Sequence, residues 1–470
     1  MKEEYFDDED FKELLSHYEE AISSGEPVFM DADDLADIAD YYQLKGRYDD
    51  AEQAVERAAE IAPESLAVLN YRVHQALDRN DLDSAQQYLD RIMERDSPEY
   101  IYDRAEILIA RGKTDEADQY LRDCLTDVPP EEYQDYVLDV ANLYGDYEQS
   151  DKAMEWMMRA RPEDSDDFKE LMARTLFGLG KYDDSERMFN ELLDRNPFEK
   201  RYWNALASTQ YMKADYNESV TSSEYAIAID PNDADAVISK ANGLYRLDNF
   251  EAALEYFERY NNLRPDDEYG YLQQASCLIS LERYKEAIER LELGLDIAED
   301  DSEYLVEMCQ EAAFAYSELH QPERALEYLD MTESMDCDHQ DMLVIRGHVM
   351  LSNGNIEEAD RLYQKAMQES NYAPRIVMRI IVSLYDNKYV EQAYQMFKNF
   401  FRLVDNDWND GYAYMALCCW DTKRYEEFLK YLKIACERNP QESRMVLAGL
   451  FPEGMASEEY YHYMQEKMKD

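Results

Sequence analysis

The chain is 470 residues long, and its 105 Asp and Glu residues against 48 Lys and Arg residues give a formal net charge of −57. A field of that sign repels phosphate backbones and anionic lipid headgroups, which excludes nucleic acid and membrane surfaces as expected partners. Hydrophobic residues make up 45% of the chain and aromatic residues 13%, so there is enough apolar surface for a packed interior.

The N-terminal segment, which begins Met-Lys-Glu-Glu-Tyr-Phe-Asp-Asp, lacks the apolar stretch of a signal peptide. No later run approaches the roughly 18 apolar residues that a membrane helix needs. Residues 9–24 carry apolar side chains at helical spacing, which predicts an amphipathic helix. We expect residues 1–31 to cap the N-terminal end of the fold.

Residues 32–440 carry one pattern in tandem, at a mean interval of about 34 residues. A small marker residue is followed four positions on by a large apolar residue and seven positions on by another small or apolar one, as in Ala51, Val55 and Ala58. These three positions share one face of a helix. The twelve marker positions are Ala51, Ala85, Ala117, Ala153, Ser185, Ser219, Ala253, Ala287, Ala325, Ala359, Ala393 and Phe428.

Each copy of the pattern predicts two helices joined by a short turn. A small or apolar residue twelve positions before the marker, such as Ala241 or Gly347, allows the two helices to approach closely. Gly46 and Gly180 mark breaks between them. Prolines that cannot continue the second helix follow the marker by twelve positions at Pro63, Pro129, Pro197, Pro231, Pro265 and Pro440. Asn232 and Asp233 after Pro231, and Asp266 and Asp267 after Pro265, are expected to cap the helices that come next.

This pattern resembles the tetratricopeptide repeat family, whose 34-residue unit places aromatic, small and proline residues at fixed offsets. One unit matches through Trp203, Leu206, Ala207, Ser219, Ala226 and Pro231. Another matches through Leu35, Ile38, Ala39, Tyr42, Gly46, Tyr48, Ala51, Ala58 and Pro63. The resemblance implies an all-α fold, a right-handed α-solenoid of about twelve repeats over residues 32–440. Residues 441–470 are expected to form two short capping helices, broken at 451–454.

No catalytic constellation is added to the repeats, so we predict a chain that is not an enzyme and needs no cofactor or metal. The six histidines show no paired spacing. Seven cysteines, odd in number and scattered, favour free thiols in a reducing compartment, and therefore a cytoplasmic protein. Three segments come near to known binding motifs but are better explained as ordinary turns. Residues 178–181 resemble a phosphate loop, 405–416 a calcium loop, and 336–341 a metal cluster.

In family members the first helix of each repeat lines a concave face where partners bind, and the central repeats carry polar and aromatic residues there. Such side chains suit an extended peptide, because amides bond its backbone and Tyr and Arg provide contact area. We predict partner binding by Arg201, Asn204, Tyr211, Asn242, Tyr245, Arg246, Tyr269 and Gln273. The family's clamp for a chaperone's C-terminal carboxylate is not matched, since Asn204 stands at one of its Lys positions and Tyr269 and Gln273 replace its Lys and Arg pair.

A more apolar stretch of the same predicted face follows towards the C-terminus, and the sequence leaves open which of the two surfaces binds. It comprises Phe314, Val344, Ile345, Leu351, Met378, Val382, Tyr385, Tyr414, Leu417 and Trp420. The leading hypothesis is a non-catalytic scaffold that binds a protein or peptide. The alternatives are an enzyme or its regulatory subunit with a site in the groove, and a self-assembling structural protein. The oligomeric state is left open.

Overall fold

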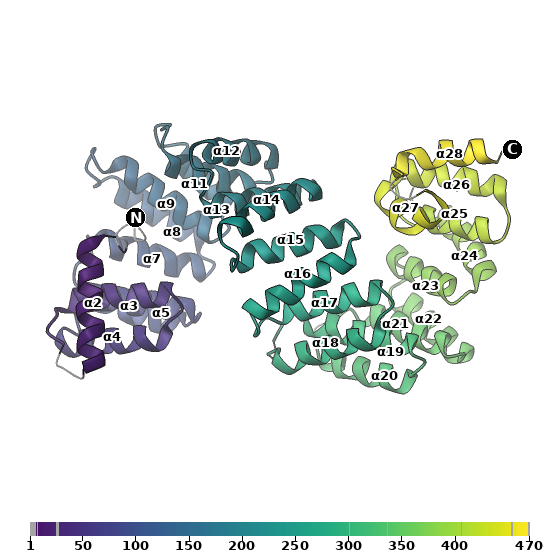
Figure 1. Ribbon diagram of the computed structural model, residues 1–470, viewed down its shortest axis with the longest axis horizontal. Helices are drawn as coiled ribbons and strands as arrows, with labels where there is room; N and C mark the ends of the chain where they lie inside the picture. The colour runs from purple at the N-terminus through teal and green to yellow at the C-terminus, as the bar shows by residue number, and fades with distance from the viewer. Residues whose placement is uncertain are drawn as a thin grey trace. The chain divides into compact units, whose positions relative to one another are not determined.

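The computed structural model describes residues 6, 8–24, 28–299, 301–335, 337–405, 407–452 and 455–468. All regular structure in these ranges is helical, with 27 α-helices, three short 3₁₀ segments and no β-strand (Figure 1). Successive helices fold back on one another as pairs. The predicted all-α fold of tandem helix pairs is therefore confirmed. Within the same ranges, no helix combines the length and the hydropathy needed to cross a lipid bilayer.

The chain divides into two compact units, residues 1–214 and 215–470. The first unit contains a leading helix, five consecutive helix pairs and one further helix. In order, these are α2 (Glu9–Ser24), α3 (Ala32–Leu44), α4 (Tyr48–Ile61), α5 (Leu66–Asp78), α6 (Leu82–Arg91), α7 (Pro98–Ala110), α8 (Thr114–Leu125), α9 (Tyr133–Asp146), α10 (Ser150–Met157), α11 (Asp166–Gly178), α12 (Tyr182–Arg195) and α13 (Lys200–Met212).

The second unit begins with a single helix, continues with six helix pairs and ends with two short helices. In order, these are α14 (Tyr216–Ile229), α15 (Ala234–Arg246), α16 (Phe250–Leu263), α17 (Glu268–Ser280), α18 (Tyr284–Ile297), α19 (Leu305–Glu318), α20 (Pro322–Met331), α21 (His339–Ser352), α22 (Ile356–Glu369), α23 (Pro374–Asp386), α24 (Val390–Leu403), α25 (Tyr412–Asp421), α26 (Tyr425–Arg438), α27 (Pro440–Leu447) and α28 (Tyr460–Lys467). The 3₁₀ segments are Thr332–Ser334, Ala448–Leu450 and Ser457–Glu459.

Odd-numbered helices from α3 to α25 are the first helices of the repeats, and even-numbered helices from α4 to α26 are the second helices. Gly46 and Gly180 take left-handed backbone angles, with φ of 71° and 69°, where the chain turns from one helix to the other. Asp233 caps α15 by accepting from two backbone N–H groups, and Asp267 caps α17 in the same way with one. The predicted turns are confirmed, and of the four predicted capping residues Asp233 and Asp267 are the caps, while Asn232 and Asp266 precede them.

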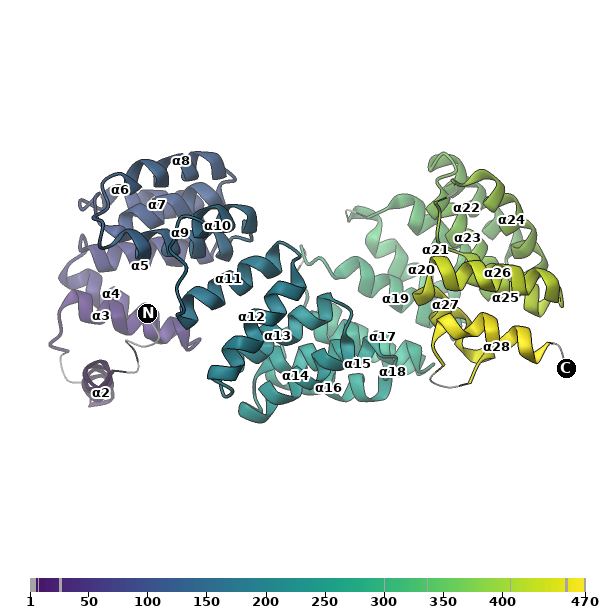
Figure 2. The same ribbon diagram turned by 90° about the horizontal axis from the view of Figure 1, so that it is seen from above.

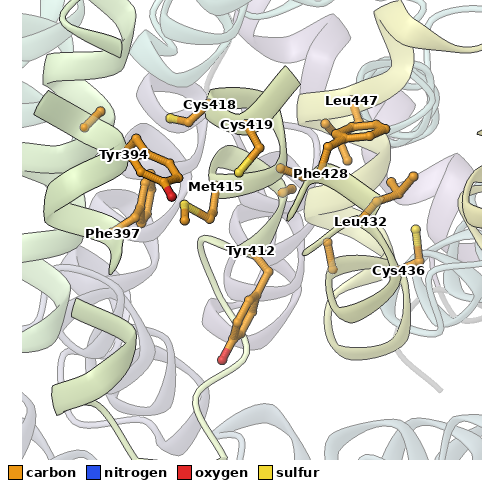
Figure 3. Packing of buried hydrophobic residues seen from close by; sticks show 14 of the residues in the cluster. Tyr394, Phe397, Tyr412, Met415, Cys418, Cys419, Phe428, Leu432, Cys436 and Leu447 are labelled. Atoms are coloured by element: carbon orange, nitrogen blue, oxygen red, sulfur yellow. The ribbon is translucent and has the colours of Figure 1, made fainter. Parts of the chain in front are cut away.

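The marker residues are buried, and all twelve are at most 1% exposed. Where the marker is polar it is satisfied locally, as Ser185 Oγ donates to the carbonyl of Ala173 at 2.9 Å. The apolar core is a series of clusters along each unit, because every pair packs against its neighbours. Figure 3 shows one such cluster at α24–α26, built around Phe397, Met415 and Phe428.

The predicted helices flanking the repeats are present. Phe11 and Tyr18 of α2 are buried against the first helix pair. At the other end α28 lies beside α26 (Figure 2), and Phe451 stacks on Tyr460 with ring centroids 3.8 Å apart. Pro440 starts α27 in addition to following α26. Glu453 and Gly454 of the predicted break lie outside the described residues.

Candidate functional site

The second unit holds a cavity of about 420 Å³ whose lining comes entirely from first helices. Four consecutive repeats contribute to it through α17, α19, α21 and α23. Seven of the thirteen lining side chains are apolar and six are polar or charged. The lining residues are Ile279, Gln310, Glu311, Phe314, Val344, Ile345, His348, Val349, Met378, Arg379, Val382, Ser383 and Asp386.

Glu311 is the most perturbed acid of the cavity. It is half-buried on α19, and burial raises its pKa to about 7. Ser276 of α17 donates to both of its carboxylate oxygens, at 2.8 and 3.0 Å, which only partly offsets the loss of water. Asp386 of α23 also lines the cavity and is exposed.

His348 belongs to a hydrogen-bonded chain that joins the cavity to the core. Its Nδ1 lies 2.8 Å from Ser383 Oγ, and the Tyr363 hydroxyl lies 2.6 Å from the same oxygen. Burial lowers the pKa of His348, so its imidazole is neutral at pH 7. Its Nε2 is buried and has no hydrogen-bond partner. The ring also faces Phe314, with centroids 6.1 Å apart.

The basic residue of the cavity, Arg379, is already engaged. Its Nη1 lies 2.9 Å from Oδ2 of Asp341, a buried carboxylate that also pairs with Arg375. Arg375 pairs with Asp338 as well, so the two arginines are matched by two carboxylates.

Three of the eight residues predicted to bind a partner lie on α13, in the first unit. Arg201 pairs with Glu170 of α11 at 3.3 Å and with Glu199 at 3.6 Å. Asn204 and Tyr211 are half-buried on the same helix. A role for these three side chains in binding stays a prediction.

The other five lie on α15 and α17 of the second unit, where the structure brings two of them together. The hydroxyl of Tyr269 donates to Oδ1 of Asn242 at 3.0 Å. Arg246 donates to the Tyr216 hydroxyl, and Tyr245 packs edge-on against Phe250. The fifth residue, Gln273, is half-buried. Their role in binding also stays a prediction.

The apolar stretch named from the sequence is partly placed around the cavity. Five of its members line the cavity: Phe314, Val344, Ile345, Met378 and Val382. Leu351 does not, because it is buried in the core between α21 and α22. Sequence reasoning did not select Glu311, His348 or Asp386. The contacts Ser276–Glu311 and His348–Ser383 each join residues 35 positions apart, about one repeat, so comparing equivalent positions of neighbouring first helices would have indicated them.

One group of metal-capable side chains occurs on the first helices of the first unit, at His74, Asp103 and Glu106. Each already has a protein partner. His74 Nε2 lies 2.9 Å from Asp103 Oδ1, Asn70 donates to both oxygens of Asp103, and Tyr147 donates to Glu106 at 3.0 Å. These hydrogen bonds give all three side chains a structural role in the packing of the helices.

The described residues of the three near-matches lie at or beside the ends of helices. Residues 178–181 end α11 and precede α12. Asp338 caps α21, and Asp341 pairs with the two arginines of α23. Asp336 and Asn406 lie outside the described residues.

The sequence matches family models described as tetratricopeptide repeat at residues 35–65 and 171–234. Residues 212–293 match the model described as anaphase-promoting complex, cyclosome, subunit 3.

Two relatives resemble parts of the chain. Protein STIP1 homolog of Dictyostelium discoideum is 28% identical over 125 residues, which are 27% of this chain and 22% of that protein. Intraflagellar transport protein 70A2 of Rattus norvegicus is 29% identical over 161 residues, which are 33% of this chain and 24% of that protein. The chain thus spans about a quarter of the length of the curated relatives that it matches.

Two solved structures are similar at lower identity. The crystal structure of yeast Tom70 aligns over 93% of this chain and 96% of its own, at 13% identity and a TM-score of 0.42. YrrB, described as a TPR protein with an unusual peptide-binding site, aligns over 43% of this chain and 97% of its own, at 17% identity and a TM-score of 0.35. On the helix pairs at a spacing of about 34 residues and the two matches to the repeat itself, the chain is a tetratricopeptide repeat protein.

Proposed function

We propose that the chain is a non-catalytic scaffold that binds a protein partner along its first helices, with the cavity of the second unit as an anchoring point. Tetratricopeptide repeat proteins generally mediate protein–protein interactions. The observation that carries the proposal is the origin of the cavity lining, which comes from the first helices of four consecutive repeats. An extended segment that crosses these helices would contact each repeat in turn.

The five predicted residues on α15 and α17 extend the proposed surface. Tyr269 of α17 donates to Asn242 of α15 at 3.0 Å, and α17 also supplies Ile279 to the cavity wall. Asn242, Tyr245 and Arg246 lie on α15, the first helix before α17, and Tyr269 and Gln273 lie on α17 itself, so we include all five in the proposed binding surface.

One observation favours the alternative of an enzyme. Ser383 and His348 lie at hydrogen-bond distance in the cavity, as do a nucleophile and its base in hydrolases. Two features oppose it. Ser383 Oγ is shared with the Tyr363 hydroxyl and the residue is buried, and among the described residues no carboxylate orients His348, whose Nε2 has no partner. We therefore assign the Ser383 and His348 side chains to packing between repeats.

A random 12-residue peptide library, displayed on phage and selected on the intact chain, tests the scaffold. Phe314 is 37% exposed at the cavity wall. Phe314→Ala should therefore weaken the binding of the selected peptides about tenfold, with little effect on folding. The matched control is Leu293→Ala on α18, a second helix, where the side chain is 45% exposed.

A variant with Asn242, Tyr245 and Arg246 all replaced by Ala tests the predicted residues in the same assay. The proposal fails if the library yields no binder, or if the binders respond to neither set of first-helix substitutions.

A further inference from the structure

The cavity of the second unit contains two acidic groups without a cationic partner. Among the described residues, neither Glu311 nor Asp386 forms an ion pair, and Ser276 is the donor to Glu311. Lys388 acts on Asp386 only through space, where the charge of Glu318 opposes it. A half-buried carboxylate with a neutral donor alone is poorly compensated for its loss of water. A positive group brought by a ligand would supply the missing compensation.

The remaining lining limits the shape of such a ligand. Phe314, Ile345, Met378 and Val382 present partly exposed apolar surface, and Val344 is buried behind it. A small hydrated cation would leave this surface in contact with water. A basic side chain with a long aliphatic stem covers it and still places its charge at the carboxylates.

The cavity does not repel a cation. His348 is neutral because burial lowers its pKa, and Arg379 is paired with Asp341 at 2.9 Å. Phe314 is 37% exposed, and its ring would add a favourable cation–π contact for an incoming guanidinium or ammonium group.

We propose, resting on the scaffold function above, that the cavity anchors a lysine or arginine side chain from an extended segment of the partner, with the stem against Phe314, Ile345 and Met378 and the charge between the two acidic sides of the cavity, Glu311 on α19 and Asp386 on α23. The partner is therefore a protein with a basic segment. The chain's net charge of −57 would also draw such a segment in.

Four pools of 12-residue peptides test this, each with a fixed central residue, namely Arg, Lys, Leu or Glu, and random, uncharged flanks. Binding to the intact chain is measured by fluorescence polarisation at low and at physiological salt. We expect the Arg or the Lys pool to bind about tenfold more tightly than the Leu pool, and the Glu pool most weakly. The double variant Glu311→Gln, Asp386→Asn should bring the basic and Leu pools to within about twofold of each other.

The matched control is Glu289→Gln with Asp296→Asn, which removes the same two charges from exposed positions on the second helix α18. It should keep the preference, and circular dichroism confirms that both double variants fold. The basic anchor is refuted if the Leu pool binds as tightly as the basic pools, if no pool binds, or if the control removes the preference as much as the cavity variant does. Tight Leu binding that Phe314→Ala weakens would refute the basic anchor alone and leave the scaffold function standing.

Discussion

Gly347 of α21 lies directly against the phenol ring of Tyr363 on α22, because a Cβ added at Gly347 would come within 2.4 Å of Tyr363 Cε1 and 2.7 Å of Cδ1. The ring has little room to move, since Tyr363 is 4% exposed and its hydroxyl is bonded to Ser383. The glycine therefore sets how closely the two helices of this repeat approach.

Gly347→Ala should destabilise the chain. Overpacking of a fixed ring costs up to about 3 kcal/mol, and the better helix propensity of Ala returns about 1 kcal/mol, so we expect a net loss of about 2 kcal/mol in the free energy of unfolding. Urea unfolding followed by circular dichroism measures it. Gly145→Ala in α9 is the control, because a Cβ there meets no atom within 4 Å. Equal stability of the two variants would contradict the steric argument.

Glu311 should make the folded state less stable as the pH rises. Burial raises its pKa from the ordinary 4.5 to about 7, so the folded state holds the proton more tightly than the unfolded chain does. The contribution of Glu311 to the stability of the folded state is present below about pH 4.5 and is lost as the pH rises through 7. Glu311→Gln should therefore raise the free energy of unfolding at pH 8 by on the order of 1 to 3 kcal/mol and flatten its dependence between about pH 5 and 8.

The exposed Glu289→Gln on α18 serves as the control for Glu311→Gln. It should leave the dependence of stability on pH unchanged. A Glu311→Gln variant less stable than the native chain at pH 8 would show that the carboxylate is well compensated, which also counts against the need for a basic ligand.

The cysteines should differ in reactivity by their burial. All seven are free thiols; Cys124 and Cys337 are partly exposed and the other five are buried. Burial raises the pKa of Cys309 and Cys436 to about 11 and that of Cys277 and Cys419 to about 12, which removes the reactive thiolate near neutral pH. Iodoacetamide at pH 7.5 should label Cys337 first, as peptide mass spectrometry would show. Rapid labelling of the buried five in the native chain would contradict their packing.

Ser383 should not react as a nucleophile. Because its hydroxyl is buried between His348 and Tyr363, a fluorophosphonate probe should leave it unmodified, while Ser383→Ala should lower stability by about 1 to 2 kcal/mol through loss of both hydrogen bonds. Labelling of Ser383 in the native chain, absent in Ser383→Ala, would instead support the enzyme alternative.

The fold was predictable because its determinants are local and periodic. The twelve marker positions recur at one spacing, and burial of each beside its partner helix follows from that spacing. The polar part of the cavity was not predictable from the sequence. Glu311 and Asp386 are two of 105 acidic residues, and they differ from the others only by what surrounds them. Leu351 was misplaced for a related reason: a position at the end of a first helix can turn towards either face, and here it packs inside.

The hydrogen bond between the hydroxyls of Tyr363 and Ser383 has a consequence for specificity. It fastens the second helix of one repeat to the first helix of the next, at a residue that also lines the cavity. The position of Ser383 in the cavity wall is thus fixed partly by α22, a helix that contributes no residue to the lining. Substitutions on the outer layer of this repeat would retune what the inner surface accepts, without any change to the residues that touch it.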